Sequence, residues 1–354
     1  MKGVILCAGE GTRMRPLTYS LPKHLIPVAN RPVIEHILDA LSRAGITDIG
    51  IVVGPSTQIS FQNALKDGSA LGMRITYIVQ ENPRGLAHAV SCAQGFVGDD
   101  PFLLYLGDNL LQEGVNGLVK KFTDSEADAV ITLYPVSDPS HFGIAQVEGE
   151  RIVKLVEKPA RPESNLAIVG AYAFTPAIFS AISRIRPSAR GELEITDAIQ
   201  RLVDDGRLVL PYQLSGWWRD VGRPSELLAA NAQLLGEIST QVEGTIARDC
   251  AVDGEVVVGK HSRIRNCTLI GPVMIGEGAN CLDSTIGPNV SIGDEVIVKD
   301  SKIGESIVLT GAEIEGVALS DSLIGRGTIV RRSPSEKVHT LLLGDHCRVE
   351  LGGD

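Results

Sequence analysis

A six-residue repeat of small aliphatic residues in the C-terminal third constrains the fold of this chain more than any other feature. Between Gly244 and Asp354 there is no Phe, Tyr or Trp, and 25 of the 111 residues are Ile or Val. Apolar residues recur at intervals of six, as at Val258, Ile264 and Ile270, and an Ile-Gly pair often marks the repeat. This period is neither helical nor that of an alternating strand. It is typical of a left-handed parallel β-helix.

The alternative fold for residues 244–354 is a β-sandwich with glycine-rich turns. The β-helix is favoured because each face of a coil needs a small aliphatic residue that points inward, with Gly or a polar residue at the corner. The repeat has this pattern, and its breaks in register around Cys281 and Ile307 are interpreted as loops or bulges. We therefore predict a left-handed parallel β-helix domain, of hexapeptide-repeat type, at 244–354.

The first part of the chain follows a different pattern, in which short apolar strands alternate with amphipathic helices. One helix opens at Pro32 and stops at Gly45, and another covers residues 86–94. The alternation predicts an α/β fold with a doubly wound, mostly parallel, Rossmann-like sheet, which binds ligands at the carboxyl ends of its strands. A helix at 224–235 is expected to join this domain, 1–240, to the β-helix. The predicted strands are 2–7, 49–53, 74–79, 102–106 and 168–172.

Composition and charge exclude several classes of protein. Apolar residues make up 44% of the chain and charged residues 21%, as in folded globular proteins. The net charge of −10 argues against nucleic acid or an anionic membrane as a partner. The apolar run at the start of the sequence is too short for a signal peptide, so none is expected. No membrane span is expected either, because no run approaches about 18 uncharged apolar residues. The six cysteines form no CxxC pair, so disulfides and zinc are not expected. We expect a cytoplasmic protein.

A glycine-containing loop with clustered cations follows the first strand. Gly9 and Gly11 would let backbone N–H groups approach a polyphosphate without a Cβ in the way. Residues 1–34 hold five cations and one acid in an otherwise acidic protein. A tight turn is the alternative, but Arg13 and Lys23 favour phosphate binding. The loop lacks the third glycine of a dinucleotide fingerprint and the Gly-Lys-Ser/Thr of a P-loop, so neither of those sites is expected.

Two aspartates are candidate metal ligands. Asp108 comes directly after the predicted strand 102–106, at the edge of the sheet where ligands bind. Asp220 lies in a bulky run that begins Gly-Trp-Trp. The alternatives are an Asx turn at Asp108, and a helix cap or an ion pair with Arg219 at Asp220.

Charged residues in the middle of the chain could bind a sugar phosphate. Lys158 carries a positive charge for a phosphate, and Glu157 can accept hydrogen bonds from sugar hydroxyls. Arg190 lies between two predicted helices. The alternatives are solvated ion pairs, of Glu157 with Lys158 and of Arg190 with Glu192 or Glu194.

Together these motifs resemble those of the sugar-1-phosphate nucleotidyltransferases. The resemblance rests on Gly-Glu-Gly-Thr-Arg-Met-Arg-Pro-Leu-Thr at 9–18 and Pro-Lys-His-Leu-Ile-Pro-Val at 22–28, and it extends along the whole chain. The chain is similar to the glucose-1-phosphate thymidylyltransferases in their long form with a C-terminal β-helix. The resemblance implies Mg²⁺-dependent transfer of a nucleotidyl group, from dTTP in the first instance, to glucose 1-phosphate, which gives dTDP-glucose and pyrophosphate.

The resemblance also implies roles for individual residues. Arg13 and Lys23 would be catalytic, and Asp108 and Asp220 would hold Mg²⁺. The residues implied in nucleotide binding are Leu6, Ala8, Gly9, Gly11, Thr12, Arg13, His24, Gln80, Gly85 and Asp108. Those implied in binding the sugar phosphate are Asn109, Gly143, Glu157, Lys158, Val169 and Arg190.

Two positions depart from the family pattern and leave other bases open. His24 stands where the family usually has Gln, and Ala8 where the loop usually has Gly, as in uridylyl- and guanylyl-transferring relatives. A uridylyl or other nucleotidyl transferase is therefore one alternative. A non-catalytic subunit that senses nucleotide sugars is another, but such proteins usually lose the loop arginine, the lysine or a metal aspartate.

The implied partners are a nucleoside triphosphate and a sugar 1-phosphate, with no nucleic acid and no membrane. In related enzymes a C-terminal β-helix serves assembly or acetyl transfer. The candidate bases for acetyl transfer, His261, His339 and His346, stand in no active-site signature. We therefore expect the β-helix to be structural and the protein to be a homo-oligomer.

Overall fold

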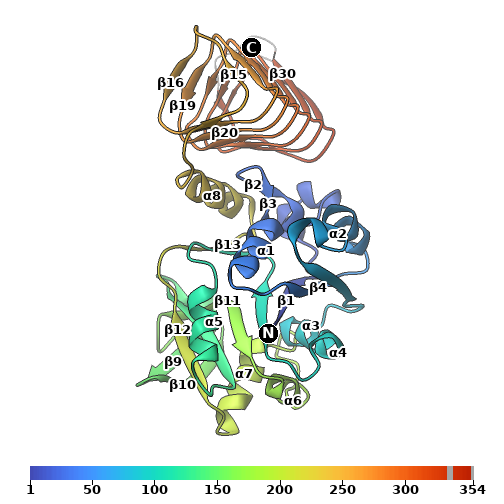
Figure 1. Ribbon diagram of the computed structural model, residues 1–354, viewed down its shortest axis with the longest axis vertical. Helices are drawn as coiled ribbons and strands as arrows, with labels where there is room; N and C mark the ends of the chain where they lie inside the picture. The colour runs from blue at the N-terminus through green and yellow to red at the C-terminus, as the bar shows by residue number, and fades with distance from the viewer. Residues whose placement is uncertain (333–337, 352–354) are drawn as a thin grey trace. The chain divides into compact units, whose positions relative to one another are not determined.

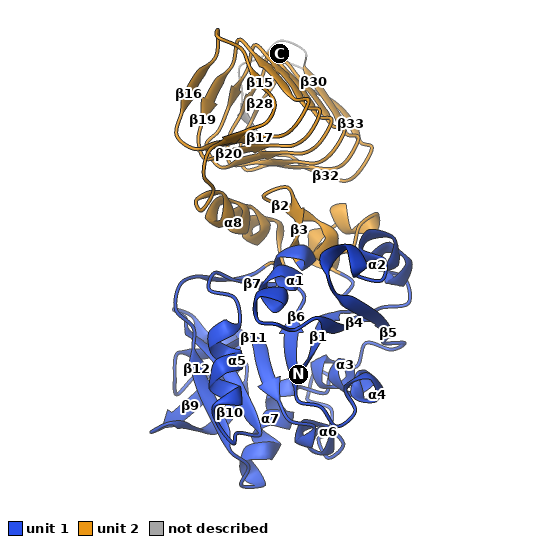
Figure 2. Cartoon of the chain, in the orientation of Figure 1, with its two compact units in different colours: residues 1–10, 34–220 blue, residues 11–33, 221–354 orange. Residues whose placement is uncertain are grey.

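The computed structural model describes residues 1–332 and 338–351, which form two compact units (Figure 2). Unit 1 consists of residues 1–10 and 34–220, and unit 2 of 11–33 and 221–354. The units group the residues differently from the domains 1–240 and 244–354, which stay a prediction. Within the described residues, no helix is long and apolar enough to cross a membrane.

Unit 1 is built on a nine-stranded mixed sheet (Figure 1). Its strands are β1 (Lys2–Cys7), β4 (Asp48–Val53), β5 (Arg74–Val79), β6 (Phe102–Leu106), β8 (Ala129–Pro135), β9 (Gly143–Glu148), β10 (Arg151–Glu157), β11 (Leu166–Phe174) and β12 (Val209–Gln213). The order is β10-β9-β11-β6-β1-β4-β5, with β8 paired to β11 and to β12. Strands β6, β1, β4 and β5 are parallel, as predicted, whereas β11 runs antiparallel to β6, β8 and β9.

The helices in the described part of the chain are α1 (Val33–Arg43), α2 (Gln58–Leu65), α3 (Leu86–Cys92), α4 (Gln94–Val97), α5 (Asn116–Thr123), α6 (Ala177–Ile182), α7 (Ile195–Asp204) and α8 (Pro224–Leu235). Helices α1 to α7 lie between the strands of this sheet along the chain, and α8 precedes the β-helix. The helix predicted at 86–94 is two shorter helices that meet at Ala93. A separate antiparallel pair, β7 (Asn109–Leu111) with β13 (Trp218–Asp220), follows β6 along the chain.

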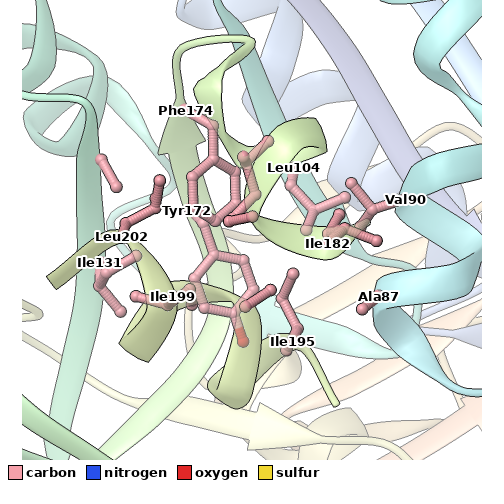
Figure 3. Packing of buried hydrophobic residues seen from close by; sticks show 14 of the residues in the cluster. Ala87, Val90, Leu104, Ile131, Tyr172, Phe174, Ile182, Ile195, Ile199 and Leu202 are labelled. Carbon is pink, nitrogen blue, oxygen red and sulfur yellow. The ribbon is translucent and has the colours of Figure 1, made fainter. Parts of the chain in front are cut away.

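The core of unit 1 centres on β11, where large side chains from the sheet meet helices α6 and α7 (Figure 3). Tyr172 and Phe174 of β11 stack with ring centroids 5.9 Å apart, and Phe174 lies 5.7 Å from Phe102 of β6. Ile195 and Ile199 of α7 pack into the same cluster. Full burial of one such side chain contributes about 1.5–3 kcal/mol to the free energy of unfolding. The packed core therefore fixes the positions of β11 and α7, which also carry polar side chains.

Unit 2 contains a parallel β-helix of three sheets. The first sheet comprises β14 (Gln241–Val242), β17 (Val256–Val258), β20 (Val273–Ile275), β23 (Val290–Ile292), β26 (Ile307–Val308), β29 (Leu323–Ile324) and β32 (Leu342–Leu343). The second comprises β15 (Thr245–Ile246), β18 (Arg263–Arg265), β21 (Asn280–Leu282), β24 (Ile297–Lys299), β27 (Glu313–Glu315), β30 (Ile329–Arg332) and β33 (Arg348–Leu351). The third comprises β16 (Ala251–Asp253), β19 (Thr268–Ile270), β22 (Thr285–Ile286), β25 (Lys302–Ile303), β28 (Ala318–Leu319) and β31 (Val338–His339).

The fold class predicted from the sequence is confirmed: a Rossmann-like sheet domain is followed by parallel sheets of the left-handed β-helix type. Small aliphatic side chains from all three sheets form one buried cluster inside the coils. The side chain of His339 lies outside the described residues, so its predicted lack of a catalytic role stays a prediction.

The coils between residues 256 and 330 are shorter than three strict repeats of six residues. Val256 pairs with Val273, 17 residues later, and Val298 pairs with Ile314, 16 residues later. The interpretation of the breaks around Cys281 and Ile307 as loops or bulges is wrong, because both residues lie in paired strands. Coils lose residues at the corners, while the strands stay in register.

Two isoleucines of neighbouring coils test the packing of the β-helix. Ile314 is 0% exposed and Ile297 is 43% exposed. Ile314→Ala is expected to lower the free energy of unfolding by about 2–5 kcal/mol, because it leaves a cavity inside the coils. Ile297→Ala is the control and should cost less than about 0.5 kcal/mol. Hydrogen exchange of peptides from these coils measures both, and equal costs would contradict the inward assignment of Ile314.

Candidate active site

The carboxyl ends of the parallel strands bring several predicted site residues to one edge of unit 1. Leu6 pairs with Leu106 in the β1–β6 register, and the Gly107 N–H donates to the Leu6 carbonyl oxygen over 2.9 Å. Asp108 therefore follows β6 beside the end of β1, which carries Ala8 and Gly9. Such an edge is where doubly wound sheets bind ligands.

Asp108 and Asp220 come together through the β7–β13 pair. Asp220 of β13 stands opposite Asn109 of β7, the residue after Asp108. The buried Asn109 amide donates to Asp108 Oδ1 over 2.9 Å, and its Oδ1 accepts from Trp218 Nε1 over 2.6 Å and from the Gly170 N–H over 3.3 Å. Asn109 thus orients the Asp108 carboxylate.

The chemistry of this donor set fits Mg²⁺. Asp108 and Asp220 offer carboxylate oxygens, both partly exposed at neighbouring backbone positions. Mg²⁺ binds through one or two carboxylates and completes its shell with water and substrate phosphates. One carboxylate in the turn before β7 and one on β13 are therefore sufficient protein ligands for a Mg²⁺ shared with a nucleotide.

Gln80 and Gly85 form a second group beyond the end of β5. The Gln80 N–H donates to the Val53 carbonyl oxygen over 2.9 Å, which fixes this residue beside β4. Its side-chain Nε2 lies 2.8 Å from His88 Nδ1 and 3.5 Å from the Gly85 carbonyl oxygen. An amide nitrogen only donates, so Nδ1 of His88 accepts, and Oε1 of Gln80 is left to accept from a ligand.

Gly85 is required by both its conformation and its surroundings. Its φ is +103°, and a Cβ there would lie 2.6 Å from the Leu193 carbonyl oxygen. Leu193 also accepts from the Ala87 N–H over 3.0 Å and donates to the Arg84 carbonyl oxygen over 2.7 Å. The start of α3 is thereby joined to the segment that leads into α7.

Three of the predicted sugar-phosphate residues, Glu157, Lys158 and Arg190, meet at the Glu157 carboxylate. Its Oε2 accepts from Thr196 Oγ1 over 2.7 Å, and its Oε1 accepts from Arg190 Nη2 over 3.1 Å. The same Nη2 donates to the buried Glu194 over 2.8 Å, and Lys158 Nζ lies 3.9 Å from Glu157 Oε1. Arg190 is therefore paired with Glu194, which was one of the alternatives given for it, and it also donates to Glu157.

The structure leaves room only for a glycine at position 143, beside the Glu157 carboxylate. A Cβ at Gly143 would lie 2.8 Å from Thr196 Oγ1 and 3.1 Å from Glu157 Oε2. Val169 is buried in β11, one residue before the glycine whose N–H binds Asn109. The strands β9, β10 and β11 thus bring Gly143, Glu157 and Val169 into one part of the sheet.

The carboxylates of Glu157 and Asp108 both influence the ionisation of one buried tyrosine. Burial, and then the negative charges of Glu157 and Asp108, raises the pKa of the Tyr172 hydroxyl. Tyr172 of β11 therefore lies close enough to Glu157 and Asp108 to interact electrostatically with both. Burial, and then the charges of Glu194 and Glu157, also raises the pKa of Asp197.

The predicted catalytic cations lie in residues 11–33 of unit 2, which we call the signature loop. Gly11 has φ +64°, and a Cβ there would lie 3.1 Å from Thr18 Cγ2 and 3.3 Å from Lys23 Cβ. Thr18 Oγ1 donates to the Gly11 carbonyl oxygen over 2.8 Å. This closed turn places Lys23 against Gly11 at the start of the loop.

Exposure distinguishes the predicted residues of the signature loop. Thr12 and Arg13 are exposed and Lys23 is half-buried, whereas His24 is only 2% exposed. His24 is thus inside unit 2, which sequence reasoning did not anticipate.

Several side chains that shape these groups were not predicted from the sequence. The sequence analysis gave no role to Trp218, Thr196, His88 or Tyr172. The sequence separation from the predicted residue ranges from eight residues, between His88 and Gln80, to 109 residues, between Trp218 and Asn109. Glu194, which precedes α7, and Asp197, in its first turn, were the features of the sequence that could have indicated a carboxylate cluster near Glu157.

Comparison with known proteins gives consistent results. The nucleotidyl transferase family model matches residues 2–237. The low-salt glycan biosynthesis nucleotidyltransferase Agl11 of Haloferax volcanii is 50% identical over 257 residues, 72% of this chain and 72% of that protein. A glucose-1-phosphate thymidylyltransferase of Streptomyces antibioticus is 44% identical over 355 residues, 99% of each chain.

A solved structure has a similar fold over 68% of the chain. It is a Bacillus anthracis protein, assigned as a glucose-1-phosphate thymidylyltransferase, in complex with sucrose. Its TM-score is 0.63 at 37% identity, over 68% of this chain and 97% of that one.

Asp197 gives the acidic cluster a testable pH signature. Its folded-state pKa is raised above 3.8, so as pH rises the unfolded chain ionises first and the folded state loses stability. Asp197→Asn removes this loss, and its unfolding temperature relative to wild type should increase between pH 4 and pH 7.

Asp67 is the control with the opposite sign. Hydrogen bonds from the Ser69 hydroxyl and N–H lower the pKa of Asp67. Its ionised form is therefore favoured in the folded state, and the wild type gains this stability as pH rises to the unfolded-state pKa of 3.8. The relative unfolding temperature of Asp67→Asn should therefore fall between about pH 2 and about pH 4 and stay level above that range. A pH-independent difference for Asp197→Asn would contradict the raised pKa.

Proposed function

The chain belongs to the nucleotidyl transferase family, and we propose that it transfers a thymidylyl group from dTTP to glucose 1-phosphate. Nucleotidyl transfer onto a sugar 1-phosphate is the activity of the family members it resembles along its whole length. The observation that carries the choice of dTTP and glucose 1-phosphate is the 44% identity over 99% of both chains to the Streptomyces antibioticus enzyme.

The reaction requires positioning and charge neutralisation. A phosphate oxygen of glucose 1-phosphate attacks the α-phosphorus of dTTP, and the bond from that phosphorus to the bridging oxygen of the β-phosphate breaks. The products are dTDP-glucose and pyrophosphate. The attacking oxygen is already anionic, so no general base is needed. The barrier lies in bringing two polyanions into line.

The cations of the signature loop suit that task. Arg13 is exposed and presents a guanidinium that can bind the leaving pyrophosphate through two N–H groups. Lys23 is half-buried beside the Gly11 turn, where it can neutralise the α-phosphate as charge develops. Backbone N–H groups of Gly9, Gly11 and Thr12 would bind the remaining phosphate oxygens.

Asp108 and Asp220 would hold Mg²⁺ on the nucleotide phosphates. When bound, the ion neutralises phosphate charge and orients the triphosphate. Asn109 keeps the Asp108 carboxylate oriented through its 2.9 Å hydrogen bond. Leu6 and Ala8 line the same edge of the sheet.

Glu157, Lys158 and Arg190 suit a sugar phosphate. Both hydrogen bonds of Arg190 to Glu157 and Glu194 come from Nη2, and a guanidinium carries five N–H donors. Its other N–H groups can therefore bind a phosphate together with Lys158. Glu157 can accept from a sugar hydroxyl, with Gly143 and Val169 beside it.

The base would be read by Gln80 next to Gly85. With Nε2 donating to His88 Nδ1, Oε1 can accept the N3–H of thymine, and cytosine has no such donor. Uracil offers the same N3–H, and this observation makes uridylyl transfer the second candidate function. The predicted homo-oligomer and the role of His24 in nucleotide binding stay predictions.

Pyrophosphate release tests the proposed function. The protein is mixed with Mg²⁺, glucose 1-phosphate and each of dTTP, UTP, GTP, CTP and ATP in turn. Fastest release with dTTP is expected, and excess EDTA should abolish it. Release chiefly with UTP would support the second candidate. No release with any triphosphate, or with galactose, mannose or glucosamine phosphates, would indicate a subunit that senses nucleotide sugars.

Lys23→Ala and Arg13→Ala are expected to lower turnover by on the order of 10²–10³, because each removes a charge-assisted donor to a developing charge. Both variants should unfold at the wild-type temperature. Arg15→Ala is the matched control, since Arg15 belongs to the same loop but its guanidinium stacks 5.0 Å from the Tyr19 ring. Steady-state kinetics with the preferred triphosphate measures all three. Wild-type turnover in Lys23→Ala or Arg13→Ala would refute their assignment.

A further inference from the structure

The signature loop is bound to the β-helix by buried hydrogen bonds. Asn231 of α8 is 1% exposed and lies at the centre of one set. Its Oδ1 accepts from the Ala29 N–H over 2.9 Å and from Ser291 Oγ over 2.7 Å. Its Nδ2 donates to the Asn289 carbonyl oxygen over 3.3 Å. Asn231 thus joins the loop to two residues in and beside β23.

The loop residues held by Asn231 form a strained turn. Strands β2 (Pro27–Val28) and β3 (Arg31–Pro32) are antiparallel and are joined by Ala29 and Asn30 alone. Their φ angles are +46° and +57°. A two-residue turn with both φ values positive favours Asn and Gly, and alanine is unfavourable there. The surroundings of Ala29 must therefore stabilise this conformation.

Asn30 adds a second hydrogen bond to the same strand. Its Nδ2 donates to the Ile292 carbonyl oxygen of β23 over 2.7 Å. Adjacent residues of the turn thus bind the β-helix, one directly and one through Asn231. The turn lies six residues after Lys23, so its position limits where the Lys23 backbone can lie.

A hydrogen bond to a carboxylate holds the loop on the other side of Lys23. Asp345 accepts from Ser20 Oγ over 2.8 Å, and Ser20 is three residues before Lys23. The Asp345 carboxylate also accepts from Arg326, over 2.8 Å from its backbone N–H and 2.7 Å from Nη2. Its side chain is 6% exposed. The pair of Asp345 with Arg326 fixes the acceptor that Ser20 uses.

We propose that Asn231 and Asp345 are positioning residues for Lys23, and that the β-helix is the platform that orders the signature loop for nucleotidyl transfer. The inference rests on the proposed function, because it assigns the loop cation a part in the reaction. Two fixed points, Ser20 and the Ala29–Asn30 turn, leave Lys23 little freedom between them. A cation ordered before the substrates bind loses little conformational entropy during the reaction.

Ser291→Ala and Ser301→Ala form the matched pair for the test. Both serines are buried in the β-helix, at 0% and 3% exposure, but only Ser291 binds Asn231, whereas Ser301 donates to the Lys299 carbonyl oxygen. Ser291→Ala and Asn231→Leu should lower kcat by on the order of 10-fold to 10²-fold with KM for the triphosphate little changed. Ser301→Ala should keep the wild-type kcat.

Rescue separates positioning from general stability. Glycine adopts positive φ readily, so Ala29→Gly should restore part of the kcat lost in Asn231→Leu. Ser20→Ala, an exposed change that keeps Asp345 paired with Arg326, should lower kcat in the same way and covers the case in which Asn231→Leu does not fold. Equal kcat in wild type, Ser291→Ala and Ser20→Ala would overturn the proposal.

Hydrogen exchange of the Ala29 amide distinguishes failure of this inference from failure of the proposed function. It should be faster in Ser291→Ala than in wild type and unchanged in Ser301→Ala, whatever reaction the protein catalyses. If no triphosphate is a substrate but exchange behaves as expected, the proposed function fails while the platform stands. If exchange is the same in all three proteins, the platform itself is wrong.

Discussion

The parallel pairing of β1 with β4 on one side and β6 on the other is the constraint on which the site in unit 1 depends. Parallel strands end at the same edge of a sheet, so residues distant in sequence become neighbours there. Ala8 follows β1, Gln80 follows β5 and Asp108 follows β6. Their backbones are held by ladder hydrogen bonds that continue to Val53 and Leu6. The groups assigned to the base, the phosphates and the metal therefore share one rigid edge, which suits a reaction governed by positioning.

Acidic side chains near a phosphate site need a physical reason, because they repel the ligand. Glu157 and the buried Glu194 are both paired with Arg190, so the cluster carries less net charge than its composition suggests. The remaining acceptor capacity of Glu157 suits hydroxyl donors, while Arg190 and Lys158 suit a phosphate. A ligand with many hydroxyls and one phosphate satisfies both, and a sugar 1-phosphate has this composition. The raised pKa of Asp197 reflects burial and the same crowding of carboxylates.

Local patterns predicted the strands 2–7, 74–79 and 102–106 and the helix 224–235 with the bounds that the structure has. Those elements are decided by apolar runs and their flanking residues, which a sequence displays. The antiparallel entry of β11 beside β6 was not predicted, since pairing between distant strands leaves no local signal. The contacts of Trp218 with Asn109, and of Asn231 with Ala29, were missed for the same reason. The length of the coils was not predicted either. Residues are lost at the corners of the coils, while the paired strands stay in register.

Residues 11–33 belong to the same compact unit as the β-helix. This grouping gives the β-helix a part in ordering the signature loop, in addition to its expected structural role. An enzyme that uses a general base or a covalent intermediate gains much of its rate from the reacting group itself. A nucleotidyl transfer that needs neither depends on where its cations are held. In this chain Lys23 lies between Ser20 and the Ala29–Asn30 turn, which are hydrogen-bonded to α8 and to the β-helix. A strained alanine turn persists only where surroundings fix it, so the coils and α8 are part of the machinery that orders the loop.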